Sequence, residues 1–386
     1  MIKTLTAYTR EIDDPEAAAA EILGQLDLPK NQLKNSLGLV SCFSEFADTG
    51  VLAALKDALP FEFIGSTTCL CGMAGQTDQV LLCLTVLTSD TVEFKTGWSD
   101  SVMTDTEAAT ATAYARAAAG QKGRPSLGFV YAPLILTISG DLMLTALDKA
   151  SGGVPLFGSS ALDHTMDYST AQTIYNGGTA RDRVAVALLY GEVNAEFDAV
   201  FVDADKIRRQ KAIITGSKYN LLISVNNTNA VEYLLSIGLT RDQITNGLGV
   251  VPLTVGYEGG GKAVARAVYS TTRDGYAVCG GEMPVNATLG VGRIDYDDVV
   301  STAEASARKM LAPDGAGALA FSCMARYLVL GARSQAEAEV FGAVACERGT
   351  PYQIMYSGGE ICPVPDENGK LKNRFHNFSL VTCKIR

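Results

Sequence analysis

A short pattern that recurs three times along the chain constrains its fold more than any other feature. An apolar, strand-like run ends in glycine and serine, and it reads FEFIGST at residues 61–67, VPLFGSSALD at 154–163 and PYQIMYSGGEI at 351–361. Glycine allows the backbone to turn where a Cβ atom would clash, and serine adds a hydroxyl beside the backbone N–H groups. In α/β sheets, ligands usually bind near such turns, at the carboxyl ends of the strands.

The elements around each turn follow the same order. A strand comes first, then a turn, a helix and the strand that ends in glycine, and another strand follows. The first strands span residues 37–41, 127–131 and 318–321, and the helices span residues 49–59, 141–150 and 335–347. We interpret this order as an internal duplication of one strand–turn–helix–strand unit; the alternative is a chance similarity between α/β segments. The predicted fold class is α/β, with mixed β-sheets and layered helices.

The length of the chain, 386 residues, exceeds one ordinary core, so two domains are expected. Polar residues increase over residues 191–209, which we interpret as the boundary. The prediction is two related α/β domains, residues 1–194 and 195–386. Some strands follow each other too closely for parallel pairing. One such hairpin is predicted between residues 171–175 and 183–190, around a turn that contains Asn176.

The charge of the chain limits its partners. The formal net charge is −10 and the isoelectric point is near 4.9, which argues against nucleic acid or an anionic membrane surface. Apolar windows such as residues 129–138 are about half as long as a membrane span requires. The N-terminal segment also lacks the apolar core of a signal peptide. We therefore expect a soluble, cytoplasmic protein, which could form a homo-oligomer.

Nine cysteines in a chain of this kind suggest reduced thiols. Cys69 and Cys71 form a CxC pair, but their neighbours supply no further metal ligands. The more probable role of these cysteines is that of small buried hydrophobes, and no metal site is predicted.

Two charged residues of the third repeat suggest a ligand site. Arg326 follows Cys323 by three residues, and Glu360 follows the glycines of the turn at 357–359. A guanidinium binds a carboxylate with two hydrogen bonds, and a carboxylate binds an ammonium group. Together they could hold the two ends of an amino acid. The alternative is a structural ion pair between Arg326 and Glu360.

Only two histidines occur, His164 and His376. An enzyme with a serine or cysteine nucleophile would need one of them as its base, and Cys323 with His376 is the only pair worth testing. Ordinary turn histidines are the more probable interpretation of both.

Several of these motifs, taken in order, resemble the FIST sensory proteins. The glycine/serine turn, an aspartate, an Asn-Gly hairpin, a Cys-x-x-Arg segment, a Gly-Glu-Ile turn and a final His-Asn pair correspond here to Gly158-Ser159-Ser160, Asp163, Asn176-Gly177, Cys323 to Arg326, Gly359-Glu360-Ile361 and His376-Asn377. The resemblance covers roughly residues 36–385. Ser159 stands where the family often has a second glycine, which affects the shape of the pocket but not the fold.

The resemblance implies a sensory protein that binds a small ligand, such as an amino acid or a similar polar metabolite, without catalysis and without a cofactor. It would act as a sensor through a signalling partner, or be a binding protein. The ligand-binding residues implied are Gly158, Ser159, Ser160, Asp163, Asn176, Cys323, Arg326, Gly359, Glu360 and Asn377. Some related proteins carry haem and sense nitric oxide, so a haem sensor with His164 or His376 as axial ligand is the alternative. An enzyme that uses Cys323 is the third possibility.

Overall fold

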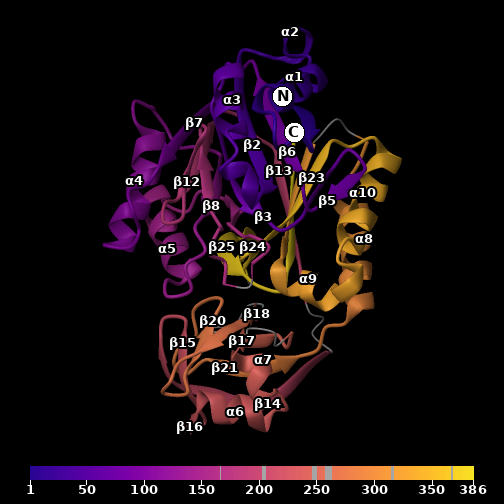
Figure 1. Cartoon of the computed structure of the whole chain (residues 1–386). Coiled ribbons are helices and arrows are strands. Elements are labelled where there is room, and N and C mark those ends of the chain that lie inside the picture. Colours follow the sequence, from indigo (N-terminus) through magenta and orange to yellow (C-terminus); the bar gives the residue numbers. More distant parts are fainter. Residues whose placement is uncertain (166, 202–205, 246–249, 257–262, 314–316, 367) are drawn as a thin grey trace.

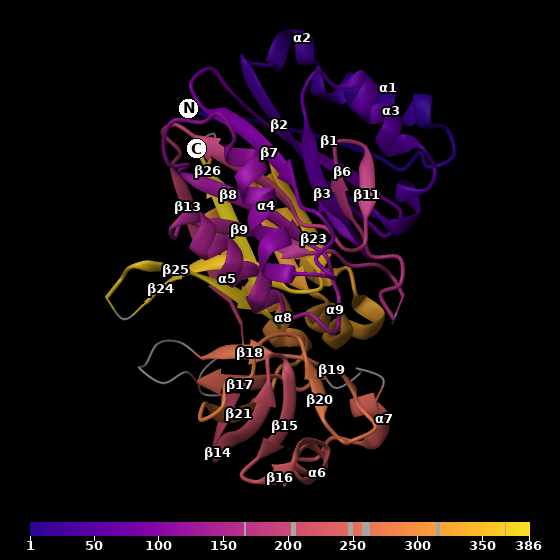
Figure 2. The same ribbon diagram turned by 90° about the vertical axis from the view of Figure 1, so that its left-hand side faces the viewer.

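The computed structural model describes the chain except residues 166, 202–205, 246–249, 257–262, 314–316 and 367, and except the side chains of residues 207–211 and 245. Its strands form four sheets, three in a larger body and one in a smaller unit below it (Figure 1). The smaller unit comprises residues 207–292, and we call it the inserted unit; the rest is the body. Both chain termini lie in the body, far from the inserted unit (Figure 1 and Figure 2).

The three sheets of the body are mixed and share one strand order. Sheet one runs β1 (Lys3–Thr9), β6 (Leu82–Ser89), β2 (Asn35–Phe43), β3 (Phe63–Thr68), β10 (Thr173–Tyr175), β11 (Gly178–Ala180). Sheet two runs β7 (Glu93–Trp98), β12 (Ala185–Tyr190), β8 (Leu127–Ala132), β9 (Leu156–Ser160), β24 (Glu360–Pro365), β25 (Leu371–His376). Sheet three runs β13 (Ala195–Val200), β26 (Leu380–Ile385), β22 (Gly317–Cys323), β23 (Tyr352–Ser357), β4 (Cys71–Met73), β5 (Gln76–Asp78).

The central pair of each sheet is parallel and is joined by helices, which confirms the predicted repeat and the α/β class. The parallel pairs are β2 with β3, β8 with β9, and β22 with β23. Their connections contain α3 (Val51–Ala58), α5 (Gly140–Ser151), and α9 (Met324–Leu330) with α10 (Ala336–Arg348). Three of these helices match the predicted ranges to within two residues. The remaining helices of the body are α1 (Pro15–Leu26), α2 (Leu28–Asn31), α4 (Thr106–Ala118) and α8 (Tyr296–Met310).

Each sheet is completed by a hairpin from another repeat. The hairpin β4–β5 of the first repeat pairs with β23 of the third, β10–β11 of the second pairs with β3 of the first, and β24–β25 of the third pairs with β9 of the second. In Figure 2 the hairpin β24–β25 lies beside β9 and α5, far from them in sequence. The three exchanges form a closed ring. Two of them, β4–β5 with β23 and β24–β25 with β9, cross the predicted boundary at residues 194/195, which itself stays a prediction.

The predicted hairpin between residues 171–175 and 183–190 is wrong. Strand β10 pairs with β11, which follows it directly, whereas β12 lies between β7 and β8 in another sheet. Asn176 and Gly177 both have positive φ angles, 48° and 85°. Two such residues form a tight turn, so the strand that begins at Gly178 turns back onto β10.

The core of the body lies where the three sheets face one another. Phe157 of sheet two stacks on Phe321 of sheet three at 5.0 Å between ring centroids, and Leu39 of sheet one belongs to the same buried cluster. The helices cover the outer faces, α1 and α3 on sheet one, α4 and α5 on sheet two, α8 and α10 on sheet three (Figure 1). None of the helices in the described parts of the chain is long and apolar enough to cross a membrane.

The inserted unit has its own sheet and core. Its strands are β14 (Ile207–Lys218), β15 (Leu221–Val225), β16 (Thr228–Asn229), β17 (Leu253–Gly256), β18 (Val264–Arg266), β19 (Val268–Thr271), β20 (Ala277–Cys279) and β21 (Thr288–Gly292). Its helices are α6 (Ala230–Ser236) and α7 (Arg241–Thr245). An ion pair between the buried Arg266 of this unit and the partly buried Asp141 of α5, 3.0 Å apart, connects the unit to the body.

Eight of the nine cysteines are buried, and only Cys346 is exposed. Cys69 and Cys71 are among the buried ones, as predicted. No cluster of three or more potential metal ligands of the His, Cys, Asp or Glu type occurs among the described residues.

Candidate functional site

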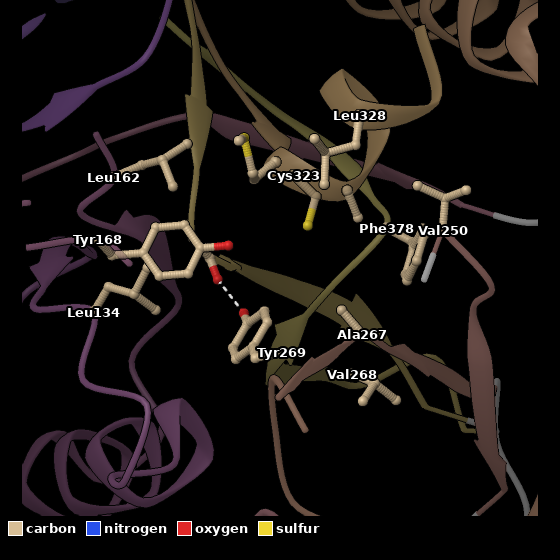
Figure 3. A pocket seen from close by; sticks show the side chains of 13 residues that line it. Leu134, Leu162, Tyr168, Val250, Ala267, Val268, Tyr269, Cys323, Leu328 and Phe378 are labelled. Carbon is tan, nitrogen blue, oxygen red and sulfur yellow. Dashed lines mark hydrogen bonds between the residues drawn. The ribbon is translucent and has the colours of Figure 1, made fainter. Parts of the chain in front are cut away.

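A cavity of about 20 Å³ lies where the inserted unit meets the body (Figure 3), with room for about one water molecule. We call it the junction cavity. Its walls are mostly aliphatic and aromatic. The body contributes Leu134, Leu162, Tyr168, Cys323, Met324, Ala325, Leu328, Gly358 and Phe378, and the inserted unit contributes Val250, Ala267, Val268 and Tyr269.

The third repeat positions much of this wall. Strand β22 ends at Cys323, which is the N-cap residue of α9, and one side of the cavity follows that helix to Leu328. Gly358 comes directly after the neighbouring strand β23. A Cβ atom on Gly358 would lie 2.7 Å from the Leu134 side chain and 2.9 Å from the Ala161 carbonyl oxygen, so only glycine fits here. The glycine turn of the repeat therefore brings backbone to the cavity wall, as the sequence pattern predicts.

Tyr269 connects the inserted unit to this turn. Its hydroxyl donates to the carbonyl oxygen of Gly358 at 2.6 Å (Figure 3), and Nδ2 of Asn377 donates to the same hydroxyl at 3.5 Å. Asn377 is buried, and its Oδ1 has no hydrogen-bond partner in the described part of the chain. Burial raises the pKa of Tyr269 well above its ordinary value, so the phenol is neutral.

A second cavity of about 10 Å³ is also lined by Tyr269. Its wall includes Leu134, Ser160, Asn220, Gly280 and Phe375. Leu134 and Tyr269 line both cavities, which are therefore neighbours.

Behind the junction cavity, Glu360 is completely buried. Its carboxyl oxygens accept hydrogen bonds from Ser357 at 2.7 Å and from Ser379 at 2.6 Å. Burial raises the pKa of Glu360 to about 8, although these hydrogen bonds and one from the Cys323 thiol oppose the shift. Burial and the neighbouring Glu360 carboxyl raise the pKa of Cys323 well above its ordinary value. At neutral pH, Cys323 is therefore an uncharged thiol.

The structure brings together six of the residues that the sequence singled out. Glu360 lies opposite Ser159 in the pairing of β24 with β9, and Gly158 lies opposite Ile361. The neighbouring Ser160 donates its backbone N–H to the Gly359 carbonyl oxygen. Thus the second and third repeats meet at Gly158, Ser159, Ser160, Gly359 and Glu360, with Cys323 next to Glu360.

Arg326 points elsewhere. It is completely buried and donates from Nε and Nη2 to one carboxyl oxygen of Glu337, at 2.9 and 2.7 Å. It also donates to the backbone oxygen of Val299. The suggested ion pair between Arg326 and Glu360 is therefore wrong, because the stronger partner stands on α10, eleven residues further along the chain.

Asp163 and Asn176 shape loops and line neither cavity. The Asp163 carboxylate accepts four hydrogen bonds, from the backbone and hydroxyl groups of Thr165 and Thr170. It thereby fixes the loop that carries Tyr168 to the cavity. Asn176 lies in the turn between β10 and β11.

The two histidines lie outside the junction cavity. His164 is exposed, and its Nδ1 lies 3.2 Å from the Ser44 hydroxyl. His376 is buried, and its Nε2 lies 3.3 Å from the Cys362 carbonyl oxygen. Burial lowers the pKa of His376 to about 4. The side chain that neighbours the Cys323 thiol and forms a hydrogen bond with it is therefore Glu360 rather than His376.

Sequence reasoning missed Tyr269, Tyr168 and Leu134. Tyr269 belongs to the alternating segment AVARAVYS at residues 263–270, which is typical of a strand. Alternation separates the two faces of a strand but does not show which face meets another unit. No pattern around Leu134 or Tyr168 indicated a cavity.

Comparison with known proteins identifies the family. The model of the FIST N domain matches residues 36–228, and that of the FIST C domain matches residues 229–363. No curated protein matches the chain. Among solved structures, the cyanuric acid hydrolase from A. caulinodans aligns with 9% identity and a TM-score of 0.38, over 100% of this chain and 99% of the other. Phosphoribosylformylglycinamidine synthase II from Thermotoga maritima aligns with 11% identity and a TM-score of 0.21, over 100% and 71%. These TM-scores are too low to support an argument about fold or function.

Proposed function

The chain belongs to the FIST family of sensory domains, and on that premise we propose that it binds a small ligand reversibly in the junction cavity and does not transform it. The observation that supports this proposal is the composition of the cavity wall, which comes from both the body and the inserted unit. A ligand bound between two parts of a protein favours the arrangement of those parts in which it makes more contacts. Such a site converts binding into a change of shape.

The space at the junction must enlarge when a ligand binds, because it now holds about one water molecule. Specific polar contacts between the described residues hold the junction closed. They include the ion pair of Arg266 with Asp141, the Tyr269 hydroxyl on Gly358, and Nδ2 of Asn220 on the Leu136 carbonyl oxygen at 3.0 Å. Ligand entry would change the second of these contacts, and the new arrangement would be the signal that an intracellular partner protein detects.

Two features support a binding role rather than catalysis. The Cys323 thiol is buried, and its raised pKa keeps it protonated, which makes it a poor nucleophile. The Glu360 carboxyl is enclosed by two serine hydroxyls. The carboxylate of an amino acid would have to compete with Glu337 for the Arg326 guanidinium. Uncharged metabolites therefore belong in the same screen.

The test is thermal unfolding of the purified protein with a panel of amino acids, small carboxylates, nucleotides, uncharged metabolites and haem. A ligand at about 100 times its Kd adds roughly 2.7 kcal/mol to the free energy of unfolding. Leu328→Trp should abolish the effect because it fills the junction cavity. Leu371→Trp, the same change at an exposed position, is the matched control and should retain it. Equal responses of the two variants would place the ligand elsewhere.

A further inference from the structure

The Tyr269 hydroxyl occupies a point where polar groups of the body meet. It donates to the Gly358 carbonyl oxygen and accepts from Nδ2 of Asn377. A hydroxyl can do both because it is a donor and an acceptor at once. The Asn377 contact, at 3.5 Å, is long for a hydrogen bond, and Oδ1 of the same buried side chain has no partner among the described residues. Tyr269 thus forms a short hydrogen bond with Gly358 but only a long one with Asn377.

The Tyr269 side chain belongs to the walls of both cavities. Together with Leu134 it lines both of them, and Gly280 of the inserted unit lies against it. A Cβ atom on Gly280 would lie 2.8 Å from the Tyr269 hydroxyl oxygen and 2.4 Å from Asn377 Oδ1. Displacement of this ring would open one continuous space with an apolar wall and a polar point at Gly358 and Asn377.

We propose that Tyr269 is a stand-in for the ligand, and that the ligand is an uncharged, largely apolar molecule whose hydroxyl or amide group replaces the Tyr269 hydroxyl between Gly358 and Asn377. This inference rests on the proposed function and specifies the class of ligand. A hydroxyl or an amide offers both a donor for the Gly358 carbonyl and an acceptor for Asn377 Nδ2. A hydrocarbon offers neither.

The charged groups that the structure describes around the junction are paired with groups of the protein, which disfavours an ionised ligand. Arg326 is bound to Glu337, and Arg266 is bound to Asp141. The Glu360 carboxyl is held by Ser357 and Ser379, and its raised pKa keeps it mainly uncharged at pH 7. Among the described residues, an ionised ligand would leave water and find these charges already paired, which is costly. The zwitterionic amino acid expected from the sequence does not suit such a site.

The experiment removes the Tyr269 side chain by substitution and adds phenol, which has the same ring and hydroxyl, from solution. Tyr269→Ala leaves a space shaped like phenol, and engineered apolar cavities of this kind bind small aromatic molecules. Phenol should raise the Tm of this variant by about 3 °C or more, and benzene should raise it clearly less. Tyr233→Ala, a buried tyrosine of α6 in the same unit, is the matched control. In the double variant Tyr269→Ala/Asn377→Leu the advantage of phenol over benzene should shrink.

Equal shifts with phenol and benzene, or no shift with either, would overturn the proposal, as would an equal preference for phenol in Tyr233→Ala. If Tyr269→Ala does not fold alone, it is refolded with each compound; recovery of folded protein with phenol but not with benzene supports the proposal, and recovery with neither overturns it. The outcome of the phenol experiment does not depend on the outcome of the ligand panel with the unmodified protein. A panel hit that Leu328→Trp abolishes, together with failed phenol rescue, would leave the sensory function intact and remove only this inference.

Discussion

Arg326 and Glu337 form an ion pair that is completely enclosed by protein. Two nitrogens of Arg326 donate to one oxygen of Glu337, and the Ser322 hydroxyl donates to its other oxygen at 2.7 Å. Arg326 also reaches the Val299 carbonyl oxygen at 3.0 Å. The pair therefore connects α8, α9 and α10 on the outer side of sheet three, and it fixes the helix that forms one wall of the junction cavity.

Removal of one partner of this pair should be costly, because it leaves the other charge buried and alone. We expect Arg326→Ala to lower the free energy of unfolding by about 3–5 kcal/mol, measured by urea denaturation. Arg10→Ala removes an exposed pair with Asp78 and should cost less than about 1 kcal/mol. The double variant Arg326→Met/Glu337→Leu should be more stable than Arg326→Ala. Equal stability of the two single variants would contradict the buried pair.

Glu360 should make the protein less stable as the pH rises. Its pKa is about 8 in the folded protein against an ordinary value of 4.5, so the unfolded chain loses this proton first. The stabilisation is complete below pH 4.5, declines between there and about pH 8, and then stays low. The decline is on the order of a few kcal/mol, at about 1.4 kcal/mol per pH unit.

Glu360→Gln should remove this decline, measured by urea denaturation at a series of pH values. Glu347→Gln, at an exposed position, should leave it unchanged. An unaltered pH profile in Glu360→Gln would show that the buried carboxyl ionises at its ordinary pH.

His376 should act in the opposite direction. Burial lowers its pKa to about 4 from an ordinary value of 6.5. Between these two pH values, His376 is therefore protonated in the unfolded chain but neutral in the folded protein. The contribution of neutral His376 to the free energy of unfolding is complete above pH 6.5 and falls as the pH drops towards 4, by about 3 kcal/mol in total. The Glu360 contribution changes in the opposite direction over the same pH range, so His376→Gln should become more stable relative to the unmodified protein as the pH falls from 6.5 towards 4.5, whereas the exposed His164→Gln should not. The two histidine variants can be compared in the same titration, and identical acid limbs would refute the assignment.

Gly158 should not tolerate a side chain. A Cβ atom there would lie 1.8 Å from the Val130 carbonyl oxygen on the adjacent parallel strand. Gly158→Ala should therefore push β8 and β9 apart and lower the melting temperature sharply. Gly24→Ala is the matched control in α1, where no atom lies within 4 Å, and it should be neutral or stabilising by about 0.5–1 kcal/mol. Circular dichroism during heating distinguishes the two results.

The repeat could be predicted from the sequence because its evidence is local. At Gly158 the apolar run, the glycine and the serines stand next to one another, and the same order recurs at Gly65. The pairing of strands could not be predicted in the same way. Cys71 and Met355 lie opposite each other in sheet three although almost the whole chain separates them. Nothing in the composition of either segment specifies that partner.

In the candidate site, too, residues of the local repeat could be predicted, whereas contacts that depend on packing could not. Glu360 and Gly359 lie beside Ser159 because all three belong to turns of the repeated unit. The partner of Arg326 was misjudged, because a guanidinium fits any nearby carboxylate and only packing selects Glu337 over Glu360. Tyr269 could not be identified, since its importance depends on how the inserted unit docks against the body.

The exchange of hairpins has a consequence for protein synthesis. When residues 71–78 have been made, β4 and β5 have no sheet to join, since β23 is completed only at Ser357. Sheet one has all its strands once Ala180 has been made, but sheets two and three wait for β25 and β26 near the carboxyl end. A chain stopped between these points exposes the edge of β9 and an unpaired hairpin, which are surfaces prone to aggregation. The nascent protein thus depends on β24, β25 and β26, and chaperones would meet a chain whose first sheet is complete while the other two are still open.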